Sequence, residues 1–157
     1  NLDHAAKFAA SVNSKGLRSA SAITVSNGSI HIGAVNNARV NGRLTAQSKT
    51  ATPSNITVQA GNNIDVGKNA RLNIASTTGN AGEIRLKAAQ NLTVAGGASF
   101  DASAKTGNAG LVDFSANGII DIGQGIKVNL SADGSKAGTL LIDPTDMVVG
   151  DTAQGDT

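Results

Sequence analysis

The feature that most constrains the fold of this chain is a 28-residue repeat. Three families of short segments recur with this period and without gaps. Their members begin at Asn55, Glu83, Leu111 and Thr139 in the first family, at Asn63, Asn91, Ile119 and Met147 in the second, and at Leu72, Phe100 and Val128 in the third. A fixed period of this length is typical of solenoid proteins, whose coils stack on one another.

Each segment alternates apolar and polar residues, which is the pattern of a β-strand with one buried face. Three strands per coil, separated by Gly, Asn and Ala corners, favour stacking of each strand on its counterpart one period earlier. The inward residues then form three columns: Ile56, Ile84, Val112, Leu140; Ile64, Leu92, Ile120, Val148; and Leu72, Phe100, Val128. We therefore predict an all-β, right-handed parallel β-helix of about five coils, with three sheets around a narrow core.

Small residues form columns of their own at the predicted corners. The Ala60, Ala88 and Ala116 positions are one such column, and Gly82, Gly110 and Gly138 are another. Glycine at a corner indicates either a positive φ or a close approach between backbones. Asn63 and Asn91 suggest a short asparagine stack.

The chain is expected to be a single β-helix segment over residues 1–157, but its pattern is irregular upstream. The expected parts are an irregular start or the end of a preceding coil at 1–21, a longer coil at 22–54 with a loop near 45–54, regular coils at 55–82, 83–110 and 111–138, and the start of the next coil with a tail at 139–157. Aligning Ala22 with Asn55 gives a 33-residue first coil, which is longer than the period. Within residues 1–21, Ala6–Ser11 is expected to be a strand, with a short helix as the alternative.

The composition is consistent with short strands and excludes several functions. The chain has three Phe, no Trp or Tyr, and no Cys, so neither disulfides nor thiolate metal sites are available. The formal charge of +2 is dispersed, and no basic cluster or stacking aromatic indicates nucleic-acid binding. Residues 1–50 carry six Lys or Arg against one Asp, whereas residues 105–157 carry three against seven Asp. This gradient suggests either a solvated surface or end-to-end pairing.

The repeat resembles a known family. The Gly79-Asn80-Ala81-Gly82 corner type, the Asn55-Ile56-Thr57-Val58 strand type and the run from Gly138 to Asp151 resemble filamentous-haemagglutinin-like exoproteins of Gram-negative two-partner secretion systems. The resemblance covers about residues 22–151, and the last run is its most specific part. It implies a right-handed β-helix, export through an outer-membrane transporter, and a role in adhesion, biofilm formation or toxin display.

One departure from the family limits what can be carried over. The sequence lacks the Asn-Pro-Asn-type motifs of the family's amino-terminal secretion domain. We therefore expect a fragment from downstream of that domain, located on the bacterial surface or secreted. Its expected partners are the secretion transporter, further coils of a longer chain or other copies stacked end to end, and a host surface or matrix ligand that the sequence does not identify.

No residue pattern predicts a catalytic, cofactor-binding or metal site. Asp65 and Asp121 share an outward column, but Thr93 separates them by two rungs, or roughly 10 Å. His4 and His31 are isolated, and the run Gly96–Asp101 only superficially matches a calcium-binding repeat because it lacks the third glycine and does not recur. The sequence therefore favours a non-enzymatic protein without cofactors.

The favoured function is a structural stalk or fibre segment of an adhesin-type exoprotein. The first alternative is a ligand-binding or self-binding module that uses the Thr45–Ser54 loop, and the second is a polysaccharide-processing enzyme. The register also predicts two ion pairs between adjacent rungs, Arg85 with Asp113 and Lys105 with Asp133.

Overall fold

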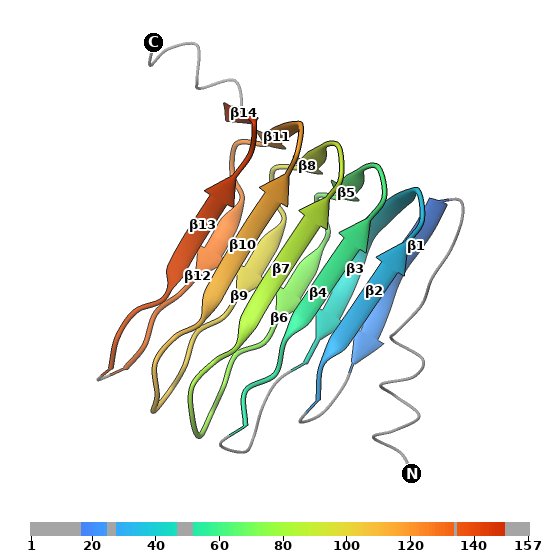
Figure 1. Cartoon of the computed structure of the whole chain (residues 1–157). Coiled ribbons are helices and arrows are strands. Elements are labelled where there is room, and N and C mark those ends of the chain that lie inside the picture. The colour runs from blue at the N-terminus through green and yellow to red at the C-terminus, as the bar shows by residue number, and fades with distance from the viewer. Residues whose placement is uncertain (1–16, 25–27, 47–51, 134, 150–157) are drawn as a thin grey trace.

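The chain winds into a solenoid of parallel strands (Figure 1). The computed structural model describes residues 17–24, 28–46, 52–133 and 135–149, and these contain strands and turns but no helix. The solenoid has about four turns of about 28 residues each, which confirms the predicted fold class. In Figure 1 the colours progress along the stack, so sequence order is also the order of the coils.

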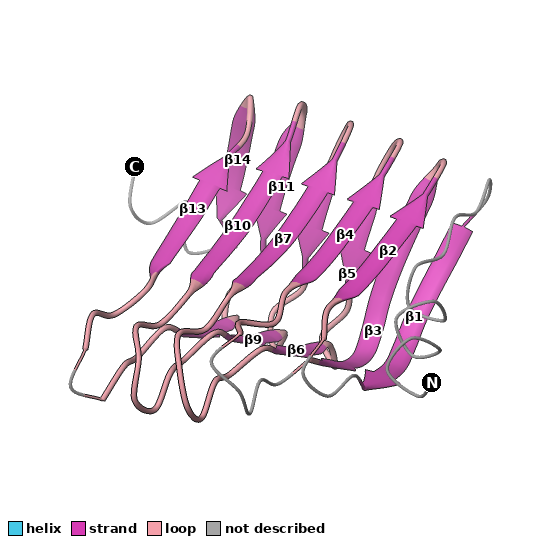
Figure 2. Cartoon of the chain, turned by 60° about the horizontal axis from the view of Figure 1, so that its bottom comes forward, coloured by secondary structure: helices cyan, strands magenta, loops and turns pink. Residues whose placement is uncertain are grey.

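The strands form three stacks. The first stack holds β2 (Ile30–Ala34), β4 (Ile56–Ala60), β7 (Glu83–Ala88), β10 (Leu111–Ala116) and β13 (Thr139–Asp143). The second holds β5 (Ile64–Val66), β8 (Leu92–Val94), β11 (Ile119–Ile122) and β14 (Asp146–Val149), and the third holds β6 (Arg71–Asn73), β9 (Ser99–Asp101) and β12 (Lys127–Asn129). Figure 2 shows β6 and β9 on a face separate from β7 and β10.

Hydrogen bonding joins these stacks into two sheets rather than the three that were predicted. The long strand β3 (Asn37–Thr45) pairs with β5 through one half and with β6 through the other, and β1 (Leu17–Thr24) pairs along β3. β3 therefore joins the second and third stacks into one sheet. Val40 pairs with Val66 and Leu44 with Leu72, so β3 crosses this corner directly, without the short turn that separates β5 from β6.

The 28-residue register of the regular coils is confirmed. Ile84 pairs with Ile56 on one side and with Val112 on the other, and Leu72 pairs with Phe100. The inward residues of the first and second stacks are almost completely buried in the regular coils, including Ile64, Leu92 and Ile120 at 0% exposed, whereas Val128 in the third stack is half-buried. Phe100 and Phe114, both predicted to face inward, meet edge to face with ring centroids 5.0 Å apart. The apolar columns are thus one continuous core.

The glycine column at the corner before the first stack is explained by close approach. A Cβ on Gly110 would lie 1.9 Å from the carbonyl oxygen of Gly82, and one on Gly138 would lie 2.1 Å from that of Gly110. Among the described glycines, only Gly97 and Gly125 have positive φ, and both are at a different corner. Of the two explanations left open by the sequence, backbone proximity applies at this column.

The first coil differs from its predicted alignment. Ile30 pairs with Ile56, so β2 belongs to the first stack. Residues 22–24 belong to β1, which pairs with β3 and is part of the preceding coil. Leu44 pairs with Leu72 and Ile56 with Ile84, so the segment between Leu44 and Ile56 is no longer than its counterpart one coil later. The expected longer coil with an extra loop near 45–54 is therefore wrong. The strand expected at Ala6–Ser11 lies outside the described residues.

The last coil also shifts by one residue. Ile120 pairs with Met147, not with Val148 as the period predicted. The N–H of Thr145 donates to Gly118 O, and this bond repeats the one that Gly118 N–H makes to Gln90 O one coil earlier. The step from Gly118 to Thr145 is one residue shorter than the step from Gln90 to Gly118. The corner that contains Pro144 is thus one residue shorter than the corner of the preceding coil.

A first prediction concerns the buried column. Ile120→Asp should unfold the chain, because it removes a side-chain burial of about 1.5–3 kcal/mol and places a carboxylate in an apolar column. Ile119→Asp is the matched control, since Ile119 is 43% exposed and Ile120 is 0% exposed. The control should change the free energy of unfolding by less than about 0.5 kcal/mol. Thermal melts followed by circular dichroism compare the stability of the two variants. Equal melting temperatures would contradict the register.

A second prediction separates the two glycine roles. Gly110→Ala should destabilise the fold by more than about 3 kcal/mol, because the new methyl group overlaps a backbone oxygen on the adjacent rung. Gly125→Ala meets no such atom but has φ of +93°, so it should cost about 1–2 kcal/mol. Urea unfolding measures both. A Gly110→Ala variant as stable as Gly125→Ala would contradict the close approach.

Candidate functional site

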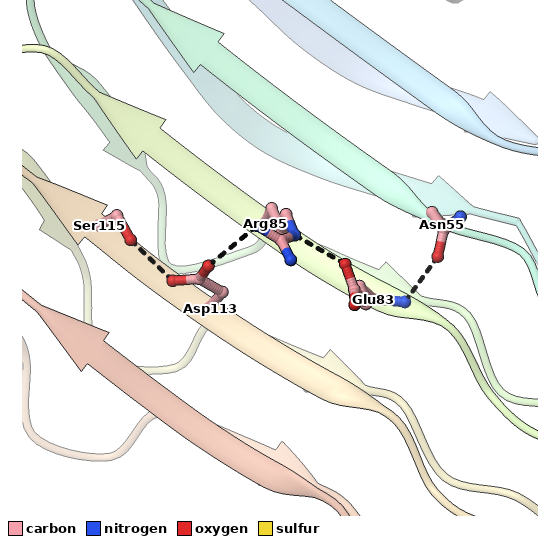
Figure 3. A network of polar contacts seen from close by, with 5 residues as sticks. All are labelled: Asn55, Glu83, Arg85, Asp113 and Ser115. Carbon is pink, nitrogen blue, oxygen red and sulfur yellow. Dashed lines mark hydrogen bonds and ion pairs between the residues drawn. The ribbon is translucent and has the colours of Figure 1, made fainter.

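The most connected polar cluster lies on the outer face of the first stack (Figure 3). Side chains alternate along a strand, so the neighbours of a buried residue point outward. On β7, Glu83 and Arg85 flank the buried Ile84, and on β10, Asp113 follows the buried Val112. The pairing of β7 with β10 then places Arg85 directly beside Asp113. The predicted proximity of these two residues is confirmed.

Arg85 joins two carboxylates on adjacent rungs. Its Nε is 2.7 Å from Glu83 Oε1, and its Nη1 is 3.5 Å from Asp113 Oδ2. Asp113 also accepts a hydrogen bond from Ser115 Oγ at 2.7 Å. The side chain of Asp113 is only 6% exposed, although it points away from the core. The cluster therefore holds a shielded carboxylate that is neutralised by an arginine.

Both carboxylates of the cluster stabilise the charged form of Arg85. The hydrogen bond to Glu83 and the charge of that carboxylate raise the pKa of Arg85 above its usual value, and Asp113 adds to the effect. Distance and burial rank the two partners differently, since Glu83 is closer but 45% exposed. We assign the larger contribution to stability to Asp113, because solvent screens an exposed pair. The cluster links rung to rung and leaves neither carboxylate free of the guanidinium.

Asparagine side chains add three ladders along the axis, each joining a side-chain oxygen to a backbone N–H on the next rung. Asn55 Oδ1 accepts from Glu83 N–H at 2.7 Å, and Asn55 N–H donates to Ser29 Oγ at 3.1 Å. The other two ladders run from Asn37 through Asn63 and Asn91 to Ile119, and from Asn80 through Asn108 to Lys136. The asparagine stack suggested by Asn63 and Asn91 is therefore longer than expected.

A further polar column closes the turn after the third stack. Asn73, Asp101 and Asn129 each accept a hydrogen bond from the N–H two residues later, which is an Asx turn. Distances range from 2.9 to 3.1 Å. The same turn thus recurs once per coil, and each of these side-chain oxygens accepts a hydrogen bond from the backbone of its own turn.

Other residues singled out in the sequence form no site. Lys105 and Asp133 follow Ala104 and Ala132, which pair across adjacent rungs, so the predicted column is confirmed. Both side chains are exposed and described, but no ion pair joins them. Asp65 and Asp121 each pair with Thr93, so they are two rungs apart as expected. His31 is exposed on β2, whereas His4 lies outside the described residues.

The Gly96–Gly97 corner has a structural explanation. Gly97 has φ of +96°, and a Cβ on Gly96 would lie 2.0 Å from Gln124 O. Arg71 Nη1 donates to Gly97 O at 3.0 Å and to Ala70 O at 2.9 Å. In the described part of the chain, no group of three or more His, Cys, Asp or Glu residues is arranged to hold a metal ion.

Two shallow grooves run along the first stack, one at the carboxyl ends of its strands and one at their amino ends. One, of about 450 Å³, is lined by Gln59, Ala60, Lys87, Ala88, Ala89, Ser115, Ala116, Asn117 and Asp143. The other, of about 490 Å³, is lined by Pro53, Asn55, Asn80, Ala81, Gly82, Glu83, Gly110 and Leu111. Both follow the axis across several rungs. The described residues also include no helix with the length and hydrophobicity of a membrane span.

Two members of the polar cluster were missed in the sequence. Glu83 and Ser115 each lie two residues from a predicted partner on the same strand, so both project from the same face as that partner. This spacing was a usable signal. The burial of Asp113 had no sequence signal.

Comparisons with known proteins identify no relative. A scan against models of protein families found no match, and neither a search of curated proteins nor one of solved structures found a similar protein.

A third prediction concerns Asp113. Asp113→Ala should destabilise the fold by about 1–3 kcal/mol, because it removes a shielded acceptor of two partners. Asp121→Ala, a change at an exposed residue on the adjacent stack, should cost less than about 0.5 kcal/mol. In double-mutant cycles, the coupling of Arg85 with Asp113 should persist at about 1 M salt, whereas that of Arg85 with Glu83 should fall. Equal salt sensitivity of both couplings would contradict this ranking.

Proposed function

We propose that this chain is a structural stalk or fibre segment of a large secreted or surface-exposed bacterial exoprotein of the adhesin type. The observation that carries the proposal is the repetition of one register through successive coils: β4, β7 and β10 stack at one constant spacing, and β5, β8 and β11 stack at the same spacing. A coil that contacts mainly its neighbours can be repeated to make a rod of any length.

The polar chemistry supports the same role. Arg85 links Glu83 to Asp113, and the asparagine ladders link one rung to the next. The Arg85–Asp113 pair and the asparagine bonds join neighbouring rungs, so they run along the axis of the solenoid. Polar groups that hold adjacent coils together are what a structural segment requires.

The biological setting rests on the resemblance to filamentous-haemagglutinin-like exoproteins. In this proposal, the segment reaches the cell surface or the medium through an outer-membrane two-partner secretion transporter. Its rod continues through further coils of a longer chain or through end-to-end association, and its parent protein takes part in adhesion or biofilm formation.

The two alternative functions receive less support from the geometry. A binding module was expected to use an extra loop near 45–54, but the register leaves no additional residues there. A polysaccharide-processing enzyme was expected to use paired carboxylates, but Asp65 and Asp121 are separated by Thr93. No specific observation favours either alternative over the stalk.

A fourth prediction tests the structural role. Deleting residues 83–110 removes one period, joins Gly82 to Leu111 and stacks Val112 on Ile56, which restores the register of the first stack. The shortened chain should stay folded and lose one rung, or about 4.8 Å of length, by small-angle X-ray scattering. Its free energy of unfolding should fall, because the buried residues of one coil are lost.

The matched control deletes one residue fewer, 83–109. A slip of one residue turns inward side chains outward, so this variant should be far less stable unless a corner absorbs the change. If deletion of the full period unfolds the chain, a modular rod is excluded. A glycan array in which the intact chain binds one sugar, and deletion of the full period abolishes binding, would instead support the binding module.

A further inference from the structure

The outward face of the third stack carries two cations on either side of a hydroxyl. Arg71 pairs with Ser99, and Ser99 pairs with Lys127 on the next rung. Arg71 and Lys127 are exposed, and Ser99 is half-buried. Because rungs are about 4.8 Å apart, the two cations are separated by roughly 10 Å along the axis. We call Arg71, Ser99 and Lys127 the basic column.

The outward face of the second stack repeats this pattern with the opposite charge. Asp65 pairs with Thr93 and Thr93 with Asp121, and all three residues are exposed. They lie in the same three coils as the basic column, because β5, β8 and β11 each precede the third-stack strand of their own coil. We call Asp65, Thr93 and Asp121 the acidic column. The two columns therefore have the same spacing, with a charge, a hydroxyl and a charge on successive inner rungs.

The charges of both columns have no ion-pair partner in the described part of the chain. The ion pairs found there belong to the Arg85 cluster of the first stack. Arg71 Nη1 donates to Gly97 O at 3.0 Å and to Ala70 O at 2.9 Å, but both acceptors are backbone carbonyls. These bonds hold the guanidinium in place and leave its Nε and Nη2 donors for an anion. Charges are thus paired on the first stack, and separated by sign on the other two.

The spacing of the basic column indicates its partner. An occupant has to present two anions roughly 10 Å apart, with an uncharged position between them. The acidic column of a second copy meets this requirement, because the same rung spacing fixes both columns. Single-stranded nucleic acid would also stack its bases on exposed aromatic side chains, and the described aromatic residues, Phe100 and Phe114, are 0% exposed.

Two further arginines determine how the copies are oriented. Arg43 precedes the basic column by one rung, and Arg39 precedes the acidic column by one rung. Parallel copies with matched columns would place Arg43 against Arg39, and like charges oppose association. Antiparallel copies instead place Arg43 at the rung that follows Asp121, where Val148 occupies the column. The antiparallel arrangement is therefore favoured.

We propose that the basic column of one copy binds the acidic column of a second, antiparallel copy, so that the solenoids associate side by side. The matched positions are Arg71 with Asp121, Ser99 with Thr93, and Lys127 with Asp65. Each contact uses two different faces, so one column on each copy stays free and further copies can add. The proposal rests on the structural role proposed above. It is tested separately, since lateral contact can fail in a chain that still tolerates the deletion of a coil.

The first test measures self-association of the full chain by analytical ultracentrifugation. Contacts between exposed charges are weak and are screened by salt. Association should therefore appear with rising protein concentration at about 0.01 M salt, where the screening length is about 30 Å, and disappear at about 1 M, where it is about 3 Å. A chain that stays monomeric at low salt, or associates equally at high salt, overturns the proposal.

Charge reversal identifies the two columns. Arg71→Glu with Lys127→Glu makes both columns acidic, and Asp65→Lys with Asp121→Lys makes both columns basic. Each double variant alone should associate at least about tenfold more weakly than the unaltered chain. An equal mixture of the two should associate again, because each variant supplies the column that the other lacks. A mixture that stays monomeric overturns the proposal.

A matched control separates the columns from net charge. Lys87→Glu with Lys105→Glu changes the net charge as much as the reversal of the basic column does, and both lysines are exposed outside the two columns. This variant should associate as the unaltered chain does, and circular dichroism should show that all variants keep their β-sheet content. Binding of dextran sulfate without self-association would assign the basic column to a polyanion and overturn the second copy as its occupant.

Cross-linking tests the contact and its orientation. The chain has no cysteine, so Ser99→Cys and Thr93→Cys each introduce a single thiol. A mixture of the two variants should form disulfides between them in preference to disulfides within either variant, and absence of this preference overturns the matched columns. In the unaltered chain, zero-length coupling between copies should join Lys127 to Asp65. Coupling between copies of Lys127 to Asp121 would overturn the antiparallel arrangement.

Discussion

Parallel pairing between strands one coil apart is the interaction on which the rest of this structure depends. It fixes the rung spacing of about 4.8 Å, and every other feature must be compatible with that distance. The glycine column is the clearest consequence, since the carbonyl of Gly82 lies 1.9 Å from where a Cβ on Gly110 would be. The core has the same origin, because pairing places Ile56, Ile84 and Val112 in one column and leaves each of them 0% exposed.

The polar residues also connect neighbouring rungs along the axis of the solenoid. Asparagines at three corners bond to backbone N–H groups of the next rung, so turns that lack a strand partner are still tied to their neighbours. On the outer face of the first stack, Arg85 connects Glu83 on its own strand with Asp113 on the next. These polar groups are thus bonded to one another or to the backbone of the next rung.

Repetition also explains how burial changes along the first stack. An inner rung is covered by the rung before it and the rung after it, so its apolar residues need no other partner. At β13 one of those covers is missing among the described residues, and Leu140 is 39% exposed although Val112 is fully buried in the same column.

The sequence by itself determined the 28-residue period, the strand positions in the regular coils and the inward columns, including Phe100 and Phe114, because translational repetition places each residue beside its counterpart one period away. Arg85 and Asp113 were predictable for the same reason. The first coil was not, because Ile23–Val25 and Ile30–Ile32 carry the same alternation, and alternation specifies a face but not a partner strand. Only the tertiary structure decided that β2 stacks on β4, that the Pro144 corner drops one residue, and that Asp113 is shielded, since these depend on how corners bend and which side chains then meet.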